Sequence, residues 1–179
     1  MYFKEVPMNI FLVGLPASGK TTLGKKLARF LNYEFLDTDD LIKQRERVTI
    51  EDIFDKRGED AFRTIEKEIL ETVIHLKDKV ISTGGGMPCF HGNMDRMNEY
   101  GTTIFLDVPV KDLLMRLGND GKENRPLTRG KNEVELYQFL ENKYKERSPF
   151  YKRAKIILEG NKIKLENIVE ALNIESQQK

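Results

Sequence analysis

The sequence predicts an α/β fold in which a parallel sheet is covered by helices on both faces. Short apolar runs alternate with segments of helical periodicity along the whole chain, and this alternation is typical of parallel sheets. The first run, 9–13, leads into a glycine-rich loop and then a helical segment. Gly14, Asp37, Asp39 and Gly84 all follow strand ends, so we expect one edge of the sheet to collect the binding residues.

The first half of the chain contains three of these strands. Thr49 is expected to cap a helix, with Asp52 at the third helical position completing a capping box. Gly58 is expected to break that helix and to separate it from a longer one. In order, the expected elements are a strand at 9–13, a helix at 22–31, a strand at 33–36, a helix at 40–45, helices at 51–56 and about 60–75, and a strand at 79–82.

The second half continues the alternation and contains one polar interruption. Gly101 and Gly118 are expected to end helices. The stretch 119–131 is polar and nearly free of apolar residues, which predicts a mobile loop. The expected elements are a helix at 93–100, a strand at 102–107, a helix at 111–117, the loop, a helix at 133–146, a strand at 154–158, a helix at 164–172 and a frayed tail at 173–179.

The composition narrows the class of protein. A length of 179 residues suits one domain. Lys plus Arg is 30 and Asp plus Glu is 29, so no strong positive field favours nucleic acid. A single cysteine, Cys89, excludes an internal disulfide framework, and His75 and His91 have no nearby partner for a metal site. No signal peptide or membrane span is recognisable, so we expect a cytoplasmic protein.

The segment 14–22 fits the P-loop pattern G-x-x-x-x-G-K-[ST]. Gly14 and Gly19 allow a tight backbone whose N–H groups form an anion-binding nest, and the following helix adds its positive end. Lys20 can bind the outer phosphates of a nucleotide, and the Thr21 hydroxyl can coordinate Mg²⁺. Ala17 stands where many P-loops have glycine, which leaves the local backbone angles open.

Polar residues at the next strand ends are candidates for a second substrate. Asp37 and Asp39 alternate at the end of a strand, so one could approach the metal and the other a substrate hydroxyl. The alternative is a helix N-cap, which we consider most applicable to Asp40. Gly84–Gly86 follow a strand and offer close backbone approach to a ligand, and Ser82 before them could hold a metal-bound water.

Four arginines have a functional and an ordinary interpretation. Arg63 and Arg147 could grip an anion, or they could be solvated charges on helix surfaces. Arg125 lies in the polar loop, where a closing arginine can neutralise charge during phosphoryl transfer. Arg116 could pack on an adenine ring or be another surface charge.

Taken together, these motifs resemble those of shikimate kinases. The P-loop is generic, whereas the combination of the other segments is much more specific. The resemblance spans roughly residues 9–158, in family order. The segments that carry it are 14–22, Phe35–Asp39, Phe62–Glu66, Ser82–Gly86, Asn124–Leu127 and Glu146–Tyr151.

The resemblance implies an ATP-dependent kinase that phosphorylates the 3-hydroxyl of shikimate, on the route to chorismate and the aromatic amino acids. It implies a three-layer P-loop fold with a central five-stranded parallel sheet, substrate-binding helices and a mobile lid. It also implies one kinase domain over 1–179, with a substrate-binding region at about 37–76 and the lid at about 118–131. The expected protein is a monomer that binds ATP and shikimate, with no nucleic acid or membrane partner.

The resemblance also assigns roles to individual residues. The implied catalytic residues are Lys20, Asp39 and Arg125. The implied ATP-binding residues are Ala17, Ser18, Gly19, Lys20, Thr21, Thr22, Arg116 and Arg125. The implied shikimate-binding residues are Asp39, Arg63, Gly84, Gly85, Gly86 and Arg147. Mg²⁺ would bind Thr21 directly, and Asp37 and Ser82 through water.

Two alternatives remain open at this point. A related small-molecule kinase, such as a gluconate or nucleoside monophosphate kinase, would share the P-loop but take another acceptor. A non-catalytic ATP-binding regulator would share the P-loop without any acceptor. The paired arginines with Asp39 favour a carboxylated polyol over a nucleobase.

Overall fold

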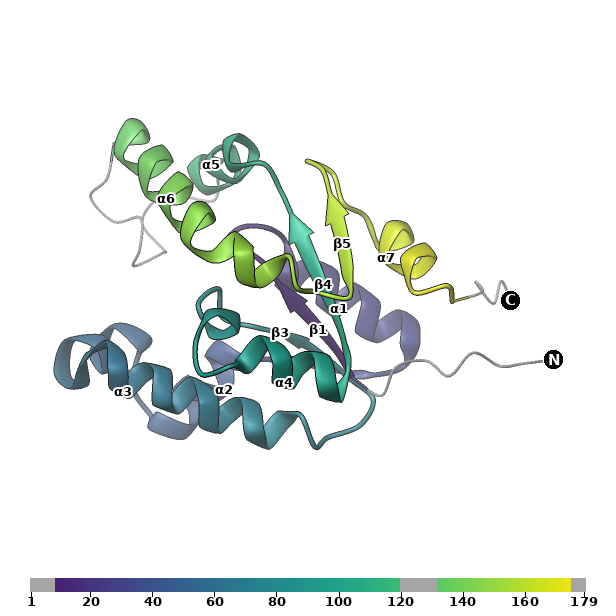
Figure 1. The fold of residues 1–179 in the computed structure, drawn as a ribbon, viewed down its shortest axis with the longest axis horizontal. Helices are drawn as coiled ribbons and strands as arrows, with labels where there is room; N and C mark the ends of the chain where they lie inside the picture. The colour runs from purple at the N-terminus through teal and green to yellow at the C-terminus, as the bar shows by residue number, and fades with distance from the viewer. Residues whose placement is uncertain (1–8, 120–131, 175–179) are drawn as a thin grey trace.

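A computed structural model describes residues 9–119 and 132–174 (Figure 1). Its centre is a five-stranded sheet in the order β2-β3-β1-β4-β5, and each pair of neighbours is parallel. This confirms the predicted α/β class and the central five-stranded parallel sheet. The strands are β1 (Asn9–Val13), β2 (Glu34–Asp37), β3 (Lys79–Ser82), β4 (Thr102–Asp107) and β5 (Ile156–Glu159).

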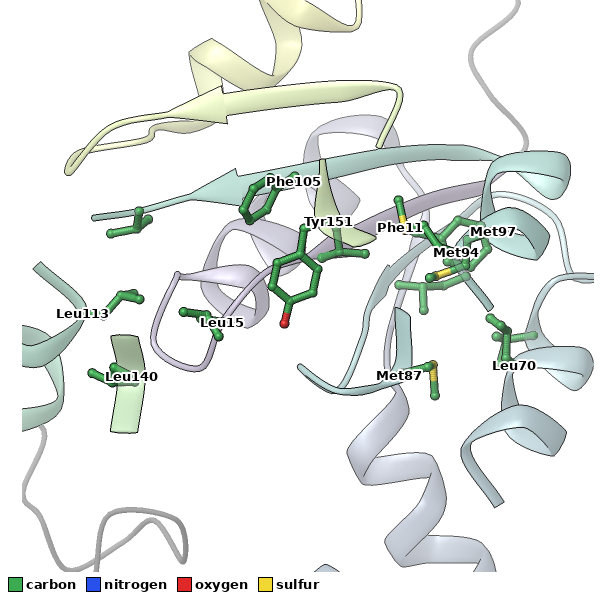
Figure 2. Close-up of a cluster of buried hydrophobic side chains, with 14 of the residues drawn as sticks. Phe11, Leu15, Leu70, Met87, Met94, Met97, Phe105, Leu113, Leu140 and Tyr151 are labelled. Carbon is green, nitrogen blue, oxygen red and sulfur yellow. The ribbon is translucent and has the colours of Figure 1, made fainter. Parts of the chain in front are cut away.

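Helices cover both faces of the sheet because the strands alternate their side chains between two apolar clusters. In β1, Phe11 and Val13 pack with side chains of α3, α4, α5 and α6 (Figure 2). Ile10 and Leu12 pack on the opposite face with α1 and α7. The helices are α1 (Lys20–Leu31), α2 (Thr38–Glu46), α3 (Ile50–Val73), α4 (Asn93–Tyr100), α5 (Val110–Asn119), α6 (Glu133–Tyr151) and α7 (Leu165–Ala171), with a 3₁₀ turn η1 (Met87–Cys89).

The helix α3 confirms the predicted capping box and the break at Gly58. The Asp52 N–H donates to the Thr49 hydroxyl at 3.1 Å, and the Thr49 N–H donates to the Asp52 carboxylate at 3.4 Å. Gly58 has φ 80° and ψ 173°, so it kinks α3 between the two predicted helices. The side chains of Ile53 and Phe62, on either side of this kink, share a third apolar cluster with α2.

Several helix boundaries differ from the prediction. α1 begins at Lys20, two residues earlier than expected, and α5 continues past Gly118 to Asn119. α2 begins at Thr38 with Asp37 as its N-cap, because the Asp37 carboxylate accepts the Asp39 N–H at 3.1 Å. The N-cap alternative therefore holds at Asp37, and not at Asp40, where it was considered most applicable.

The largest difference lies in α6, which continues to Tyr151 rather than ending at residue 146. Pro149 lies inside its last turn, and a proline there removes one helical hydrogen bond. The cost is limited because Lys145 and Pro149 are both exposed, so water can reach the freed carbonyl. The flanking side chains of Arg147 and Tyr151 are buried, and their packing holds the turn helical.

Other expectations fall outside the described part of the chain. The predicted loop from residue 120 to 131, including Arg125, and the end of the tail are among them. Within 9–119 and 132–174, no helix combines the length and apolar character that a membrane crossing requires.

Gly24 lies where α1 packs closely against side chains of the sheet. A Cβ added there would lie 2.6 Å from Cε2 of Phe35 and 3.1 Å from Cδ1 of Leu12. Although alanine usually stabilises a helix relative to glycine, we expect Gly24→Ala to lower the free energy of unfolding by about 1–3 kcal/mol. Urea denaturation measures this, with Lys26→Ala on the exposed face of α1 as the control. A Gly24→Ala variant as stable as the wild type would contradict this packing.

Candidate active site

The phosphate loop connects β1 to α1 through a strained backbone. Gly14 has φ 145° and Gly19 has φ 100°, values that glycine tolerates best. A Cβ on Gly14 would also lie 3.0 Å from the Leu106 carbonyl oxygen. Ala17 has φ 64°, so it adopts a left-handed conformation without the freedom of glycine. The loop thus keeps its shape despite the departure from the usual sequence.

Lys20 closes this loop from inside. Its side chain is buried, and Nζ donates to the carbonyl oxygens of Gly14 and Leu15, both at 2.9 Å. The residue is also the first of α1, so its ammonium group adds to the positive end of that helix. The loop and Lys20 together provide a concentrated site for an anion.

The predicted metal-binding residues lie where the first turn of α1 meets the carboxyl ends of β2 and β3. The Thr21 hydroxyl donates to Oδ2 of Asp37 at 3.1 Å, and Asp37 pairs with Ser82 in the register of the two strands. Hydroxyl and carboxylate oxygens suit Mg²⁺, which keeps several waters and phosphate oxygens as further ligands. Among the described residues no group of three or more His, Cys, Asp or Glu could hold a metal. The residues present therefore fit a nucleotide-bound Mg²⁺ rather than a fully protein-bound ion.

Gly84–Gly86, here called the triple-glycine turn, brings the second set of predicted residues together. A Cβ on Gly84 would lie 2.5 Å from Oδ1 of Asp39, and one on Gly86 would overlap the guanidinium of Arg63. A Cβ on Gly85 would lie 3.1 Å from Nη1 of Arg147 and 3.5 Å from the Gly14 carbonyl oxygen. The turn therefore lies between the phosphate loop and three charged side chains, and a side chain at Gly84 or Gly86 would displace Asp39 or Arg63.

Arg63 is buried, so its interpretation as a solvated helix charge was wrong. Its guanidinium forms ion pairs with Glu59 at 2.8 Å and Glu66 at 2.6 Å. The ring of Phe90 lies 4.2 Å from its Cζ atom, a distance at which cation–π attraction contributes. These contacts fix the plane of the guanidinium beside the triple-glycine turn. Phe90 was not predicted as a site residue, because no local sequence pattern identifies it.

Arg147 is also buried, inside α6 rather than at its end. Its Nε atom has no hydrogen-bond partner in the part of the chain that the structure describes. An unpaired buried donor is costly, and it is explained when the donor serves a ligand. Arg147 and Arg63 face the triple-glycine turn from two different helices, which suits a carboxylate held from two sides.

Asp39 supplies a carboxylate at the same turn. Burial, and then the charge of Asp37, raise the pKa of Asp39 above its ordinary value, while the charge of Lys20 opposes them. A half-buried carboxylate beside Gly84 can accept hydrogen bonds from the hydroxyl groups of a ligand. Asp37 bonds Thr21 whereas Asp39 lies beside Gly84, and this difference arises from helical geometry rather than strand alternation. Their roles at a metal and at a substrate hydroxyl stay predictions.

Glu66 is a site residue to which the sequence analysis assigned no role. It is 1% exposed, and burial raises its pKa to about 7, although the charge of Arg63 lowers it. The available signal was its spacing, because a residue three positions after Arg63 lies on the same helix face. Glu66 accepts a hydrogen bond from the Arg63 guanidinium at 2.6 Å and orients it.

The raised pKa of Glu66 makes stability depend on pH. The folded chain holds this proton up to about pH 7, whereas the unfolded chain releases it near 4.5. The stabilising contribution is therefore present at low pH and is lost as the pH rises through about 7. The matched control is Glu66→Gln, which cannot titrate. We expect the difference in the free energy of unfolding, wild type minus Glu66→Gln, to fall by up to about 3 kcal/mol between pH 4.5 and 7. Urea denaturation across this range measures the difference, and a constant difference would contradict the assignment.

Arg116 contacts the phosphate loop directly. Its Nη1 donates to the Ala17 carbonyl oxygen at 3.0 Å, and its Nη2 donates to the Asn161 carbonyl oxygen at 2.6 Å. The interpretation as an ordinary surface charge was therefore wrong. Its contact with adenine stays a prediction, and Arg125 lies outside the described residues.

Comparison with known proteins decides the family. The family model described as shikimate kinase matches residues 16–175. The chain belongs to the shikimate kinase family. A shikimate kinase of Bacteroides fragilis is 45% identical over 91% of this chain and 90% of its own length. A shikimate kinase of Phocaeicola vulgatus is 41% identical over 91% of this chain and 93% of its own length.

Solved structures of shikimate kinases show the same fold. The crystal structure of the Bacteroides thetaiotaomicron shikimate kinase has a TM-score of 0.89 and 39% identity, covering 94% of this chain and 99% of its own. The Acinetobacter baumannii shikimate kinase in complex with shikimate has a TM-score of 0.82 and 36% identity. The match covers 94% of this chain and 91% of that chain. The predicted membership and the P-loop kinase fold are confirmed.

Proposed function

We propose that this chain transfers the terminal phosphate of ATP to the 3-hydroxyl of shikimate. The observation that carries the proposal is the triple-glycine turn, where Gly85 lies between Arg147 and the Gly14 carbonyl of the phosphate loop. A phosphate cradle and a carboxylate grip therefore share one rim of the sheet. A ligand that bridges them would bring a hydroxyl group to the end of a bound nucleotide.

On the nucleotide side, the N–H groups of Ala17–Thr22 would cradle the phosphates, and Lys20 would move from its loop carbonyls to the outer phosphate oxygens. Arg116 would lie near the adenine, and Arg125 would belong to a lid that excludes water. Thr21 would hold Mg²⁺, with Asp37 and Ser82 on its waters, and the ion would neutralise phosphate charge.

On the acceptor side, the guanidinium groups of Arg63 and Arg147 would hold the carboxylate of shikimate, with N–H groups of the triple-glycine turn beside them. Asp39 would accept hydrogen bonds from the hydroxyls and orient the one that is phosphorylated. Because the transition state of phosphoryl transfer is loose, Asp39 mainly positions this oxygen and takes its proton late. Lys20 and Arg125 would offset the charge on the transferred group.

An assay that couples ADP release to NADH oxidation tests the function. We expect ATP-dependent turnover with shikimate, and little with gluconate or a nucleoside monophosphate, since neither matches both arginines and Asp39. Greater turnover on either competitor would overturn the choice of acceptor. Binding of ATP without turnover on any acceptor would favour the regulator instead.

We also infer the setting in which the enzyme works. The single cysteine suits the reducing cytoplasm, and the near-neutral charge disfavours nucleic acid as a partner. ATP and shikimate are the expected partners, without a membrane, and the resemblance to shikimate kinases implies a monomer. Gel filtration with light scattering would measure the oligomeric state, and a stable dimer would contradict the monomer.

A further inference from the structure

Tyr151 lies one turn beyond Arg147 at the end of α6, and its hydroxyl donates to the Gly85 carbonyl oxygen at 2.5 Å. The residue is fully buried, and its ring centroid lies 5.0 Å from that of Phe105 (Figure 2). Burial raises the pKa of Tyr151 above its ordinary value, so the hydroxyl remains a donor at any working pH. The mechanism above gives this hydroxyl no role.

The hydrogen bonds of the triple-glycine turn are unevenly divided between donors and acceptors. All three of its carbonyl oxygens accept a bond, whereas only one of its three N–H groups donates one within 9–119 and 132–174. The carbonyls of Gly84, Gly85 and Gly86 accept from Met87 N–H at 3.1 Å, Tyr151 hydroxyl at 2.5 Å and Cys89 N–H at 2.9 Å, and the Gly84 N–H donates to the Thr38 hydroxyl at 2.9 Å. The turn therefore keeps two N–H groups, on Gly85 and Gly86, for a ligand.

The middle of this turn is the part most able to reorient. A flip of the peptide between Gly85 and Gly86 would rotate φ of Gly86 from −86° to about +90°, a value that glycine adopts readily. The flip would exchange the Gly86 N–H for the Gly85 carbonyl oxygen. A carbonyl oxygen repels a carboxylate, so a flipped turn would oppose the ligand that Arg63 and Arg147 attract.

We propose that Tyr151 is a positioning residue that locks the Gly85–Gly86 peptide with its N–H toward the carboxylate of the acceptor. This inference rests on the proposed function. The hydroxyl comes from a residue 66 positions away, so it also fixes the turn to the helix that carries Arg147. One bond thus sets both the donors of the turn and their distance from the arginine.

The test compares two Tyr→Phe variants on the same helix. Tyr151→Phe removes the bond to Gly85 and the contact of the hydroxyl with Arg147, and keeps the buried ring. The orientation of the Gly85 carbonyl in a crystal of this variant therefore separates the two effects. Tyr144→Phe is the matched control, because its hydroxyl lies one turn before Arg147 and donates to Asp107 at 3.2 Å instead. We expect Tyr151→Phe to raise the KM for shikimate about tenfold or more, with kcat and the KM for ATP nearly unchanged. Tyr144→Phe should leave all three within about twofold.

A neutral ligand separates anion recognition from a general loosening of α6. Calorimetry should show that Tyr151→Phe weakens binding of shikimate but not of shikimate methyl ester, and a crystal of this variant should show the Gly85 carbonyl turned. An unchanged KM for shikimate, an equal loss in Tyr144→Phe or an equal loss for the ester would each overturn the inference. A wild type without shikimate-dependent turnover would overturn the proposed function itself, so the two failures are distinguishable.

Discussion

Replacing Lys20 with methionine is expected to lower kcat by about a hundred- to a thousandfold, with the fold retained. The loss follows because a positioned charge acting on a transferring phosphoryl group contributes most in the transition state. Methionine keeps most of the buried stem of the side chain, so the apolar contacts of the first turn of α1 remain. Steady-state kinetics with saturating shikimate measure the effect, and circular dichroism checks the fold.

Lys26→Met is the matched control for this variant. Lys26 lies on the exposed face of the same helix, so its loss should change kcat by less than about twofold. A Lys20→Met enzyme that turns over at nearly the wild-type rate would remove the phosphate loop from the chemistry. Equal losses in the two variants would show that the effect is not specific to the loop.

Arg63→Ala is expected to weaken shikimate binding by about 30- to 5,000-fold, which corresponds to about 2–5 kcal/mol. ATP binding should change little, because the side chain lies on the acceptor side of the triple-glycine turn. This variant should also lose stability, since Glu66 is 1% exposed and would keep no ion pair with Arg63. Calorimetry with each ligand, together with urea denaturation, measures the three quantities.

Arg147→Ala provides the comparison, because the buried Nε of Arg147 has no hydrogen-bond partner among the described residues. It should weaken shikimate binding to a similar degree, with a smaller loss of stability than Arg63→Ala. If shikimate affinity is unchanged in either variant, that arginine does not hold the carboxylate. If the two variants lose equal stability, the account of Glu66 is wrong.

The sheet and its order of elements were predictable because each strand carries a continuous apolar run between punctuating residues. The ends of the helices were less predictable. The sequence around Pro149 reads locally as a stop, yet α6 continues to Tyr151 since buried packing outweighs one lost backbone bond. Likewise Asp37 and Asp40 are equally good caps by composition, and only the path of the chain after β2 selects Asp37.

The site was predictable from the sequence only in part, for the same reason. Lys20, Thr21 and the triple-glycine turn are identified by local spacing, because their function depends on the backbone next to them. The roles of Glu66, Phe90 and Tyr151 depend on contacts with other elements. Tyr151 meets Gly85 across 66 positions, and no local pattern in one sequence encodes that distance. Arg63 shows the intermediate case, in which a surface position on a helix becomes buried through its partners Glu59 and Glu66.

The central claim is that one rim of the sheet holds both a nucleotide phosphate and the carboxylate of the acceptor. A crystal structure with ADP and shikimate measures this directly. The account predicts the shikimate carboxylate between Arg63 and Arg147, and its 3-hydroxyl beside Asp39, facing the ADP β-phosphate above Lys20. Shikimate bound elsewhere, or with its carboxylate turned toward the phosphate loop, would contradict it.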